Sequence, residues 1–268
     1  MIDEIVDDSG NLRRLGSLIP ESLNLCGAPT FAEKYPAWSD EQIREAITDP
    51  LREPARRIFG NTWIHNQGSF GSCNGWATAG VGARARYWRG MKDGKQFSGS
   101  FTYSRINRGV DRGSALYEGM VSIGRDGLCP IELCKPNQIY KNQISSEAVT
   151  EAAKRKALVR TAYHISTIRE LRTALAMRLP CVVAVHAGRN LQRLNQQKIA
   201  GVDSGRGNHS VLCDDLCIIG GHEVFDFANS WGLQYGDNGR AYLTEEHFAQ
   251  TIGVHDFFAV GDIEEAGT

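Results

Sequence analysis

The sequence predicts an α+β fold, because helix signals dominate its first half and strand signals its second half. The chain has 268 residues, of which 41% are hydrophobic and 23% are charged. This composition suits one sizeable globular domain, or two lobes that share an interface. The helices and strands are segregated along the chain, which argues against an alternating βαβ arrangement.

Charge and hydropathy narrow the classes of partner. The formal net charge is −1, so no basic field favours a nucleic acid as partner. No run approaches the roughly 18 apolar residues that a membrane-spanning helix needs. The acidic residues 1–8 lack the apolar region of a secretory signal. We therefore expect no nucleic-acid or membrane partner, and a cytoplasmic or virion-associated location is favoured.

Residues 1–60 differ from the rest and hold five of the eight prolines. A capping box from Ser39 to Gln42, with Ile43 and Ile47 behind it, predicts one short helix. We expect an extended N-terminal arm that is too short and too polar to hold its own core. Such an arm could inhibit the protein as a propeptide, or it could bind a partner.

A long helix is expected from Cys73 to about Arg89. Its apolar residues lie on several faces, and small residues such as Ala77 would let neighbouring backbones approach closely. Gly80 and Gly82 each cost about 1 kcal/mol of helix propensity. Their presence predicts a tightly packed central helix.

Further elements follow in the second half. Helices are predicted over residues 146–158 and over residues 167–178, where a capping box begins the helix and Pro180 ends it. Runs of apolar and β-branched residues separated by turn signals predict four strands. These strands are expected at residues 181–186, 210–219, 223–228 and 241–243.

The chain has seven cysteines, and an odd count without a secretory signal favours reduced thiols. Cys129 and Cys134 lie close in sequence, as do Cys213 and Cys217. Zinc ribbons more often use two matching C-x2-C pairs, which are absent from this sequence. We therefore expect these cysteines to be small buried side chains, and we expect no metal and no cofactor.

Two segments far apart in sequence carry the candidate chemistry. The first runs from Gln67 to Cys73, and the second contains His209 and is followed by Asn229. A thiol attacks a carbonyl as thiolate, and a helix N-terminus or an adjacent imidazolium lowers its pKa. We interpret Cys73 as nucleophile, His209 as its base and proton donor, and Asn229 as the group that orients the ring. Gln67 would donate a hydrogen bond to the oxyanion.

Taken one at a time, these residues have structural explanations. A lone cysteine is usually structural, and a histidine at a strand end is more often a satisfied polar residue. Asn229 to Gly232 could simply form a turn that ends a strand. The order and number of the residues together favour the catalytic interpretation.

These segments closely resemble those of the papain-like cysteine peptidases, of bacterial or phage type. Gln67 to Cys73 matches the family's Gln-Gly-x-x-Gly-Ser-Cys run, and Asn229 to Gly232 matches its Asn-Ser-Trp-Gly run. His209 lies 136 residues after Cys73, and Asn229 lies 156 residues after it. The family places these residues about 130–150 positions downstream.

The resemblance implies a papain-like two-lobed fold over residues 61–262, followed by a short tail at 263–268. A helical lobe is expected over about residues 67–135, with its central helix starting at Cys73. An antiparallel, β-barrel-like lobe is expected over about 136–262. The implied activity is that of a thiol endopeptidase acting on a protein or peptide substrate.

The resemblance also implies substrate-binding residues. Asp111, Gly113 and Ser114 belong to a Gly-containing segment where the family places the loop that borders the S2 and S3 subsites. Asn208 and Trp231 adjoin the catalytic histidine and asparagine and complete the set. Trp231 could also shield the hydrogen bond of the histidine from water.

Two positions depart from the family pattern. Phe70 stands where secreted members carry a disulfide cysteine, and Asn74 replaces the aromatic residue that usually follows the nucleophile. The arm also lacks a recognisable version of the long helical motif of the usual prosegment. Two alternatives therefore stay open. One is a non-catalytic structural or binding protein in a larger assembly such as a phage particle; the other is a hydrolase of cell-wall peptides or isopeptide bonds.

Overall fold

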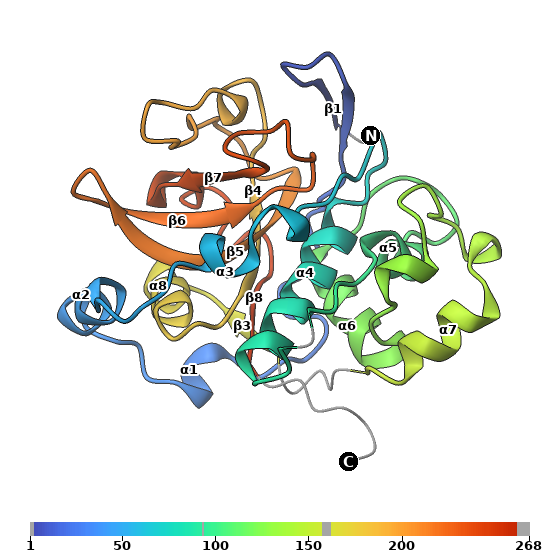
Figure 1. Ribbon diagram of the computed structural model, residues 1–268, viewed down its shortest axis with the longest axis horizontal. Helices are drawn as coiled ribbons and strands as arrows, with labels where there is room; N and C mark the ends of the chain where they lie inside the picture. The colour runs from blue at the N-terminus through green and yellow to red at the C-terminus, as the bar shows by residue number, and fades with distance from the viewer. Residues whose placement is uncertain (1–2, 93, 157–161, 262–268) are drawn as a thin grey trace.

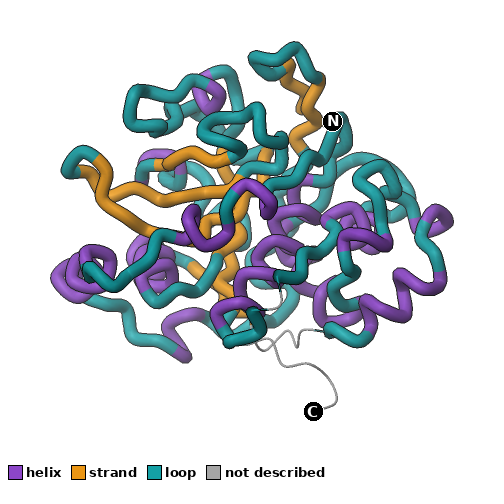
Figure 2. The backbone as a smooth tube through the Cα atoms, viewed as in Figure 1, coloured by secondary structure: helices purple, strands orange, loops and turns teal. Residues whose placement is uncertain are grey.

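A computed structural model describes residues 3–92, 94–156 and 162–261 of the chain. The α-helices between residues 73 and 153 gather on one side, and the larger sheet lies on the other side together with the remaining α-helices; the two lobes meet along a common interface (Figures 1 and 2). The structure confirms the α+β class and the two-lobed arrangement. The expected tail at 263–268 and the last two residues of the helix expected over 146–158 lie outside the described residues.

The central helix α4 (Cys73–Trp88) begins at the residue that the sequence predicted, and nearly all of its residues are buried. Small side chains permit this burial. A Cβ on Gly75 would lie 2.3 Å from the carbonyl oxygen of Gly99, the first residue of α5 (Gly99–Ile106). Only glycine therefore allows the two helices to cross so closely. On its other side α4 contacts the strand β5 (His209–Ile219), so it is held between the two lobes.

Two more helices complete the helical lobe. The helix α6 (Leu116–Asp126) packs against both α4 and α5, and α7 (Ser146–Ala153) packs against α6. A separate apolar cluster fills the space between them and consists of Phe101, Cys129, Cys134, Ala148 and Ala152. Short 3-10 helices lie at Asn61–Trp63, Ile131–Leu133, Lys141–Gln143, Asn190–Gln192 and Glu245–His247.

The second lobe is a six-stranded antiparallel sheet with the strand order β3-β8-β4-β5-β6-β7. The strands other than β5 are β3 (Ala162–Ile165), β4 (Cys181–Val185), β6 (His222–Ala228), β7 (Arg240–Leu243) and β8 (Phe257–Val260). The helix α8 (Ile168–Ala176) starts at the predicted capping box and packs against β4 and β5. Within the described residues β3 and β7 are the edges, so the sheet is open and does not close into a barrel.

The N-terminal region is more structured than the extended arm with one helix that the sequence predicted. It holds a hairpin and three α-helices: β1 (Asp3–Val6), β2 (Leu12–Leu15), α1 (Phe31–Lys34), α2 (Asp40–Thr48) and α3 (Ala55–Phe59). The helix α2 is the predicted one. The other two helices have four and five residues, which is too short for a full apolar repeat to appear in the sequence.

This region needs no core of its own, because its apolar side chains join those of the whole molecule. Phe31 and Ile43 are fully buried in the main core. Phe59 is equally buried; its ring makes an edge-to-face contact with Tyr87 of α4 and a tilted contact with Trp63 of the 3-10 helix that follows it. The sequence predicted a segment too polar to hold its own core. The segment is ordered because other elements supply the apolar side chains against which it packs.

Buried ion pairs tie the same region to the sheet. Arg52 pairs with Asp215 at 2.7 Å, and Arg56 pairs with Asp226 at 2.7 Å. Both carboxylates are almost fully buried on β5 and β6. Removing one partner of a buried pair typically costs about 3–5 kcal/mol. These pairs therefore hold α3, and the segment that precedes it, against the strands.

A third buried carboxylate links the two lobes. Asp214 of β5 pairs with Arg84 of α4 at 3.0 Å and also with Arg240 of β7. Burial alone would raise the pKa of Asp214, but the charges of Arg240 and Arg84 outweigh burial and lower it. The carboxylate stays ionised, and the helix of Cys73 is thereby attached to the sheet.

Candidate functional site

The four predicted catalytic side chains come from four different positions in the fold and meet between the lobes. Cys73 is the first residue of α4, and Gln67 lies in the turn that leads into this helix. His209 is the first residue of β5, and Asn229 directly follows β6, its neighbour in the sheet. The antiparallel pairing of β5 and β6 places the start of one strand beside the end of the other.

His209 and Asn229 form the hydrogen bond that the sequence predicted. His209 Nε2 lies 2.9 Å from Asn229 Oδ1. The Trp231 ring stacks on the imidazole, with centroids 4.9 Å apart and an interplanar angle of 32°. Trp231 itself is only 1% exposed, so it excludes water from the bond. This arrangement leaves Nδ1 of His209 as the nitrogen available for chemistry, and that atom has no hydrogen-bond partner.

Gln67 is held in place by a residue that the sequence analysis did not single out. Ser230 Oγ donates to Gln67 Oε1 at 2.6 Å, and Gln67 N–H donates to the Ser230 carbonyl oxygen at 2.8 Å. The side-chain NH2 of Gln67 consequently points the other way, toward the carbonyl oxygen of Phe70 at 2.7 Å and that of Arg14 at 3.0 Å. In this structure both bonds go to carbonyl oxygens of the protein's own backbone.

Cys73 is fully buried, and burial raises the pKa of its thiol. Backbone groups of Ser210 and Gly16 oppose this rise but do not reverse it. Burial likewise lowers the pKa of His209 to about 4, although the bond to Asn229 works in the other direction. In this arrangement both partners are neutral. A thiolate–imidazolium pair requires that the groups be less deeply buried than they are here.

Residues 3–18, which we call the plug, contact the groups around Cys73. Gln67 Nε2 donates to the Arg14 carbonyl oxygen at 3.0 Å. The Ser17 N–H donates to the Asn208 carbonyl oxygen at 2.9 Å. The plug thus places one backbone carbonyl against the candidate oxyanion donor and one N–H against the residue before the candidate base.

Gly16 is the residue of the plug that crosses Cys73. Its carbonyl oxygen accepts from the Ser114 N–H at 2.8 Å. A Cβ on Gly16 would lie 2.0 Å from the Gly71 carbonyl oxygen, where no side chain fits. The backbone of the plug is therefore in direct contact with the wall of the site, and a glycine is needed for that contact.

Arg13 anchors the plug on the side of Trp231. It is 3% exposed, and its guanidinium donates to Asp7 at 2.8 Å, to Asn66 Oδ1 at 2.7 Å and to the Trp231 carbonyl oxygen at 3.0 Å. The hairpin β1–β2 supplies Asp7 from its turn (Figure 1). The hairpin therefore holds Arg13 in the orientation that binds the site.

The predicted loop Asp111 to Ser114 borders the plug. Asp111 accepts from the Gly71 N–H at 2.9 Å and from Tyr103 Oη at 2.8 Å, and it pairs with Arg14 at 3.0 Å. Tyr103 Oη in turn accepts from the Gly113 N–H at 2.9 Å. Asp111 thus organises the turn before Cys73, and Gly113 and Ser114 present backbone to the plug.

Asn208 also holds the segment before the candidate base. Its side chain accepts from the Ala187 N–H at 2.8 Å and donates to Asp3 at 3.0 Å. Its carbonyl oxygen is free of the sheet and accepts from the plug. Of the predicted substrate-binding groups, Asn208 therefore offers a backbone acceptor, while the Trp231 ring covers the imidazole.

The two departures from the family pattern have clear structural roles. Asn74 is fully buried and donates to Ser114 Oγ at 3.0 Å and to the Ala115 carbonyl oxygen at 2.7 Å. It therefore fastens the loop that borders the plug to the start of α4. Phe70 packs against the apolar cluster around Tyr103, where a disulfide would otherwise restrain the turn.

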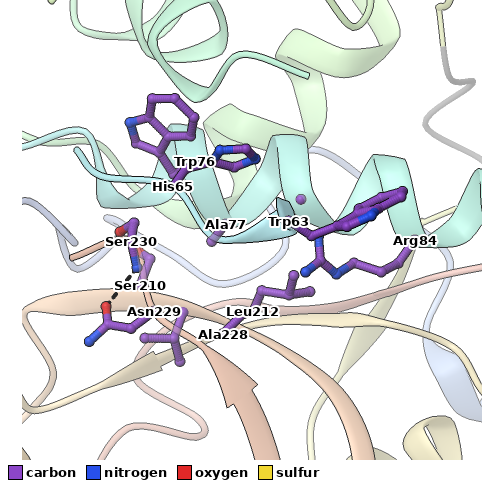
Figure 3. A pocket seen from close by; sticks show the side chains of 12 residues that line it. Trp63, His65, Trp76, Ala77, Arg84, Ser210, Leu212, Ala228, Asn229 and Ser230 are labelled. Atoms are coloured by element: carbon purple, nitrogen blue, oxygen red, sulfur yellow. Dashed lines mark hydrogen bonds between the residues drawn. The ribbon is translucent and has the colours of Figure 1, made fainter. Parts of the chain in front are cut away.

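A small cavity lies behind the candidate catalytic groups, between α4 and the strands β5 and β6 (Figure 3). Its volume is about 20 Å³, which is enough for one water molecule. Asn229 and Ser230 lie at one end and Arg84 at the other. His65 lines it between them, and burial together with the charge of Arg84 lowers the pKa of His65 to about 4.

All seven cysteines are free thiols, and five of them are buried. Within the described residues no group of three or more His, Cys, Asp or Glu side chains is placed to hold a metal ion. No helix of the described part of the chain has both the length and the apolar character to cross a bilayer.

Sequence reasoning missed the residues of the plug and Ser230. Ser230 lies inside the motif that identified Asn229. Nothing in that motif indicates the hydrogen bond from Ser230 to Gln67. The hairpin could have been recognised from Asp8 to Asn11, a turn-forming run between two strand-like segments. No local signal indicates which surface that hairpin contacts.

Comparison with known proteins identifies the fold of this chain. No protein-family model and no curated protein sequence matches the chain. Among solved structures, xylellain, a cysteine protease from Xylella fastidiosa, aligns with a TM-score of 0.68 at 17% identity over 93% of this chain and 96% of its own. ProCathepsin B S9 from Trypanosoma congolense aligns at 0.66 and 15% identity, covering 94% and 86% of the two chains. Bromelain from Ananas comosus, bound to the E64 inhibitor, aligns at 0.57 and 17% identity, covering 74% and 93%. The chain therefore has the fold of the papain-like cysteine proteases.

Proposed function

We propose that the protein is a cysteine endopeptidase that hydrolyses peptide bonds through Cys73. The observation that carries this proposal is the pair of oriented side chains beside the N-terminus of α4. His209 is fixed by Asn229 at 2.9 Å, and Gln67 is fixed by Ser230 at 2.6 Å. Because Asn229 and Ser230 are consecutive, these two bonds hold the imidazole and the amide on one short segment, on a fold shared with known cysteine proteases.

The geometry supports acyl transfer in two steps. Cys73 Sγ gives its proton to His209 Nδ1 and attacks the substrate carbonyl carbon, and the carbonyl oxygen becomes an oxyanion. Gln67 Nε2 and the Cys73 N–H, which has no acceptor within its helix, would stabilise that charge. His209 then protonates the leaving amine. In the second step it takes a proton from water, whose oxygen attacks the acyl carbon; the C–S bond then breaks, the acid leaves, and His209 returns the proton to Cys73 Sγ.

We also propose that the plug inhibits the enzyme that carries it. Cys73, His209 and Gln67 are all fully buried while the plug is in place. The Arg14 carbonyl oxygen takes the hydrogen bond from Gln67 that a substrate carbonyl would need. Because no substrate reaches a sulfur atom that is fully covered, the structure described here is an inactive form.

The direction of the plug supports inhibition without cleavage. Arg13 lies at Trp231, Gly16 at Cys73, and Ser17 beside Ser114. If the Ser114 loop borders the S2 subsite, a substrate residue there precedes the scissile bond. In the plug, the residue beside Ser114 is Ser17, which comes after Gly16, the residue at Cys73. The plug backbone thus runs opposite to a substrate, and its peptide bonds are presented in the wrong order for attack.

Parallel assays of the wild type and of Cys73→Ala test the proposed activity. A peptide library is digested with each protein, and iodoacetamide labelling in the native state is located by mass spectrometry. We expect hydrolysis by the wild type alone once the plug is displaced, and labelling of Cys73 ahead of the other cysteines. Equal labelling of several cysteines, with no hydrolysis by either protein, would instead favour a non-catalytic binding protein of the same fold.

A further inference from the structure

We propose that the group of oxygen atoms which holds the Arg13 side chain is a binding site for an arginine side chain of the substrate. The site selects arginine at the first or second residue after the scissile bond. This inference rests on the proposed function, because it assigns a substrate class to the proposed peptidase.

Three acceptors outside the plug hold the Arg13 guanidinium. Arg13 Nη1 donates to Asn66 Oδ1 at 2.7 Å and, at 3.4 Å, to the Gly68 carbonyl oxygen. Arg13 Nη2 donates to the Trp231 carbonyl oxygen at 3.0 Å. We call these three oxygen atoms the guanidinium site. Its acceptors face both Nη atoms of the planar fork, which the single ammonium group of lysine cannot match.

The guanidinium site is held together by bonds that do not involve the plug. Asn66 and Trp231 form an antiparallel β-bridge, and the Gly232 N–H donates to the His65 carbonyl oxygen at 3.0 Å. These contacts join the turn before α4 to the segment after β6. The acceptors are therefore oriented before a ligand arrives, which lowers the entropic cost of binding.

The Asn66 side chain presents its oxygen atom to the site. The Gly68 N–H donates to Asn66 Oδ1 at 2.9 Å, which identifies this atom as the acceptor of the amide. Asn66 Nδ2 lies on the other side, where a Cβ on Gly232 would be 3.1 Å away from it. Asn66 is exposed even with the plug in place, so a substrate can reach it from the solvent.

The surroundings of the site indicate which part of the substrate it binds. In the proposed reaction His209 protonates the leaving amine, so the residues after the scissile bond lie on the side of His209. The Trp231 ring stacks on His209, and the Trp231 carbonyl oxygen belongs to the guanidinium site. Burial is the main cause of the lowered pKa of His209, and the nearby charge of Arg13 lowers it further. A side chain bound here therefore belongs to the leaving part of the substrate.

The plug also indicates the distance from the scissile bond. The Arg14 carbonyl oxygen accepts from Gln67 Nε2 at 3.0 Å, the bond that the scissile carbonyl would need. Arg13 is the adjacent residue of the plug. Successive residues of an extended chain are about 3.3 Å apart, so the bound side chain lies one or two residues from the scissile carbonyl.

The charge of the site suggests a substitution that should strengthen it. In the plug, Asp7 pairs with Arg13 Nε at 2.8 Å. Asp7 belongs to the plug, whereas the three oxygen atoms of the guanidinium site are neutral. Asn66→Asp would place a carboxylate where Asn66 Oδ1 now accepts from Arg13, and hydrogen bonds between charged groups are stronger than those to neutral acceptors.

The test uses the full chain with Arg13→Ala and Gly16→Ala. The first change empties the guanidinium site, and the second displaces the plug at Cys73. A peptide library is digested, and the first two residues of each new N-terminus are identified by mass spectrometry. The best-cleaved sequence is then synthesised with arginine or with citrulline, its uncharged analogue, and the two peptides compete in one reaction. The ratio of their cleavage rates does not depend on the fraction of molecules with an open site.

We expect arginine to be enriched at one of these two positions, and cleavage of the arginine peptide to be about 10- to 100-fold faster. Asn66→Ala should lower this ratio about tenfold, and Asn66→Asp should raise it. Ser69→Ala, at an exposed residue of the same turn, is the matched control and should leave the ratio unchanged. Equal cleavage of the two peptides, or equal effects of Asn66→Ala and Ser69→Ala, would overturn the proposal.

A binding measurement separates this proposal from the peptidase assignment. Cys73→Ala is added to the same protein, and titration calorimetry compares peptides that begin Arg-Gly-Gly or Gly-Arg-Gly with their citrulline counterparts. Tighter binding of an arginine peptide, weakened by Asn66→Ala, would uphold the site even if no peptide is hydrolysed, and the peptidase assignment would then fail. Equal affinities, or no binding at millimolar concentrations, would overturn the site, and hydrolysis without selection for arginine would leave the peptidase assignment standing alone.

Discussion

Replacing Gly16 with alanine should displace the plug and activate the protein. The added Cβ would lie 2.0 Å from the Gly71 carbonyl oxygen, whereas real Cβ contacts are not shorter than 3.0 Å. The plug must therefore move by about 1 Å or more at this point. Gly16 does not have a positive φ, so alanine can adopt the local backbone conformation and the effect is purely steric.

The expected magnitude follows from the bonds that such a shift disrupts. Hydrogen bonds of 2.8, 2.9 and 3.0 Å join the plug to Ser114, Asn208 and Gln67. Each is worth about 0.5–1.5 kcal/mol net. Their combined loss of about 1.5–4.5 kcal/mol corresponds to about a 10- to 2,000-fold increase in the population with an open site. The rates of iodoacetamide labelling and of peptide hydrolysis should rise by similar factors.

Ser17→Ala is the matched control for this change. Ser17 is the next residue of the plug and is also buried, but its hydroxyl has no hydrogen-bond partner. Removing it should leave both rates within about twofold of the wild type. If Gly16→Ala labels Cys73 no faster than Ser17→Ala does, the plug does not control access to the sulfur atom.

Three further variants test the site and its surroundings. In a protein opened at the plug, Gln67→Ala should lower kcat about 100- to 1,000-fold, because it removes the proposed oxyanion donor; a loss below about threefold would contradict that role. His65→Phe, made in the inactive Cys73→Ala protein, should reduce acid sensitivity. The pKa of His65 is about 4 in the folded protein against an ordinary 6.5, so stability falls as the pH drops from 6.5 toward 4. From pH 7.5 to 5, urea unfolding should show about 2 kcal/mol less loss for the variant, and an equal loss would contradict the assignment. Asn74→Ala leaves Ser114 Oγ without its donor and Thr78 Oγ1 without its acceptor, so the free energy of unfolding should fall by about 1–3 kcal/mol; an unchanged value would show that the amide is dispensable.

The elements that carry the candidate catalytic residues could be predicted because their signals are local. The helix that begins at Cys73 combines a glycine-rich turn with a run of small residues, and both features are visible in the sequence. The strand that begins at His209 is an apolar run with a turn before it. The pairing of His209 with Asn229 followed from motifs whose order and spacing are typical of one family.

The contacts of the N-terminal region could not be predicted, because they join residues far apart in sequence. Nothing near Gly16 indicates that it passes the Gly71 carbonyl oxygen, and nothing near Arg13 indicates the Trp231 carbonyl oxygen as its acceptor. Phe31 is a single apolar residue in a helix of four residues, so no periodic pattern marks its burial. Such side chains are buried by elements that the local sequence does not describe.

The place of the plug in the chain also has a consequence for synthesis. A ribosome makes residues 3–18 before it makes Cys73, and it makes Asn229 long after both. The sheet that orients His209 cannot form until β6 has emerged, and by then residues 3–18 have already been synthesised. A complete site therefore never exists in the absence of the segment that covers it. Because the plug precedes the candidate catalytic residues within one polypeptide, a newly folding molecule already contains the segment that covers its site when that site forms.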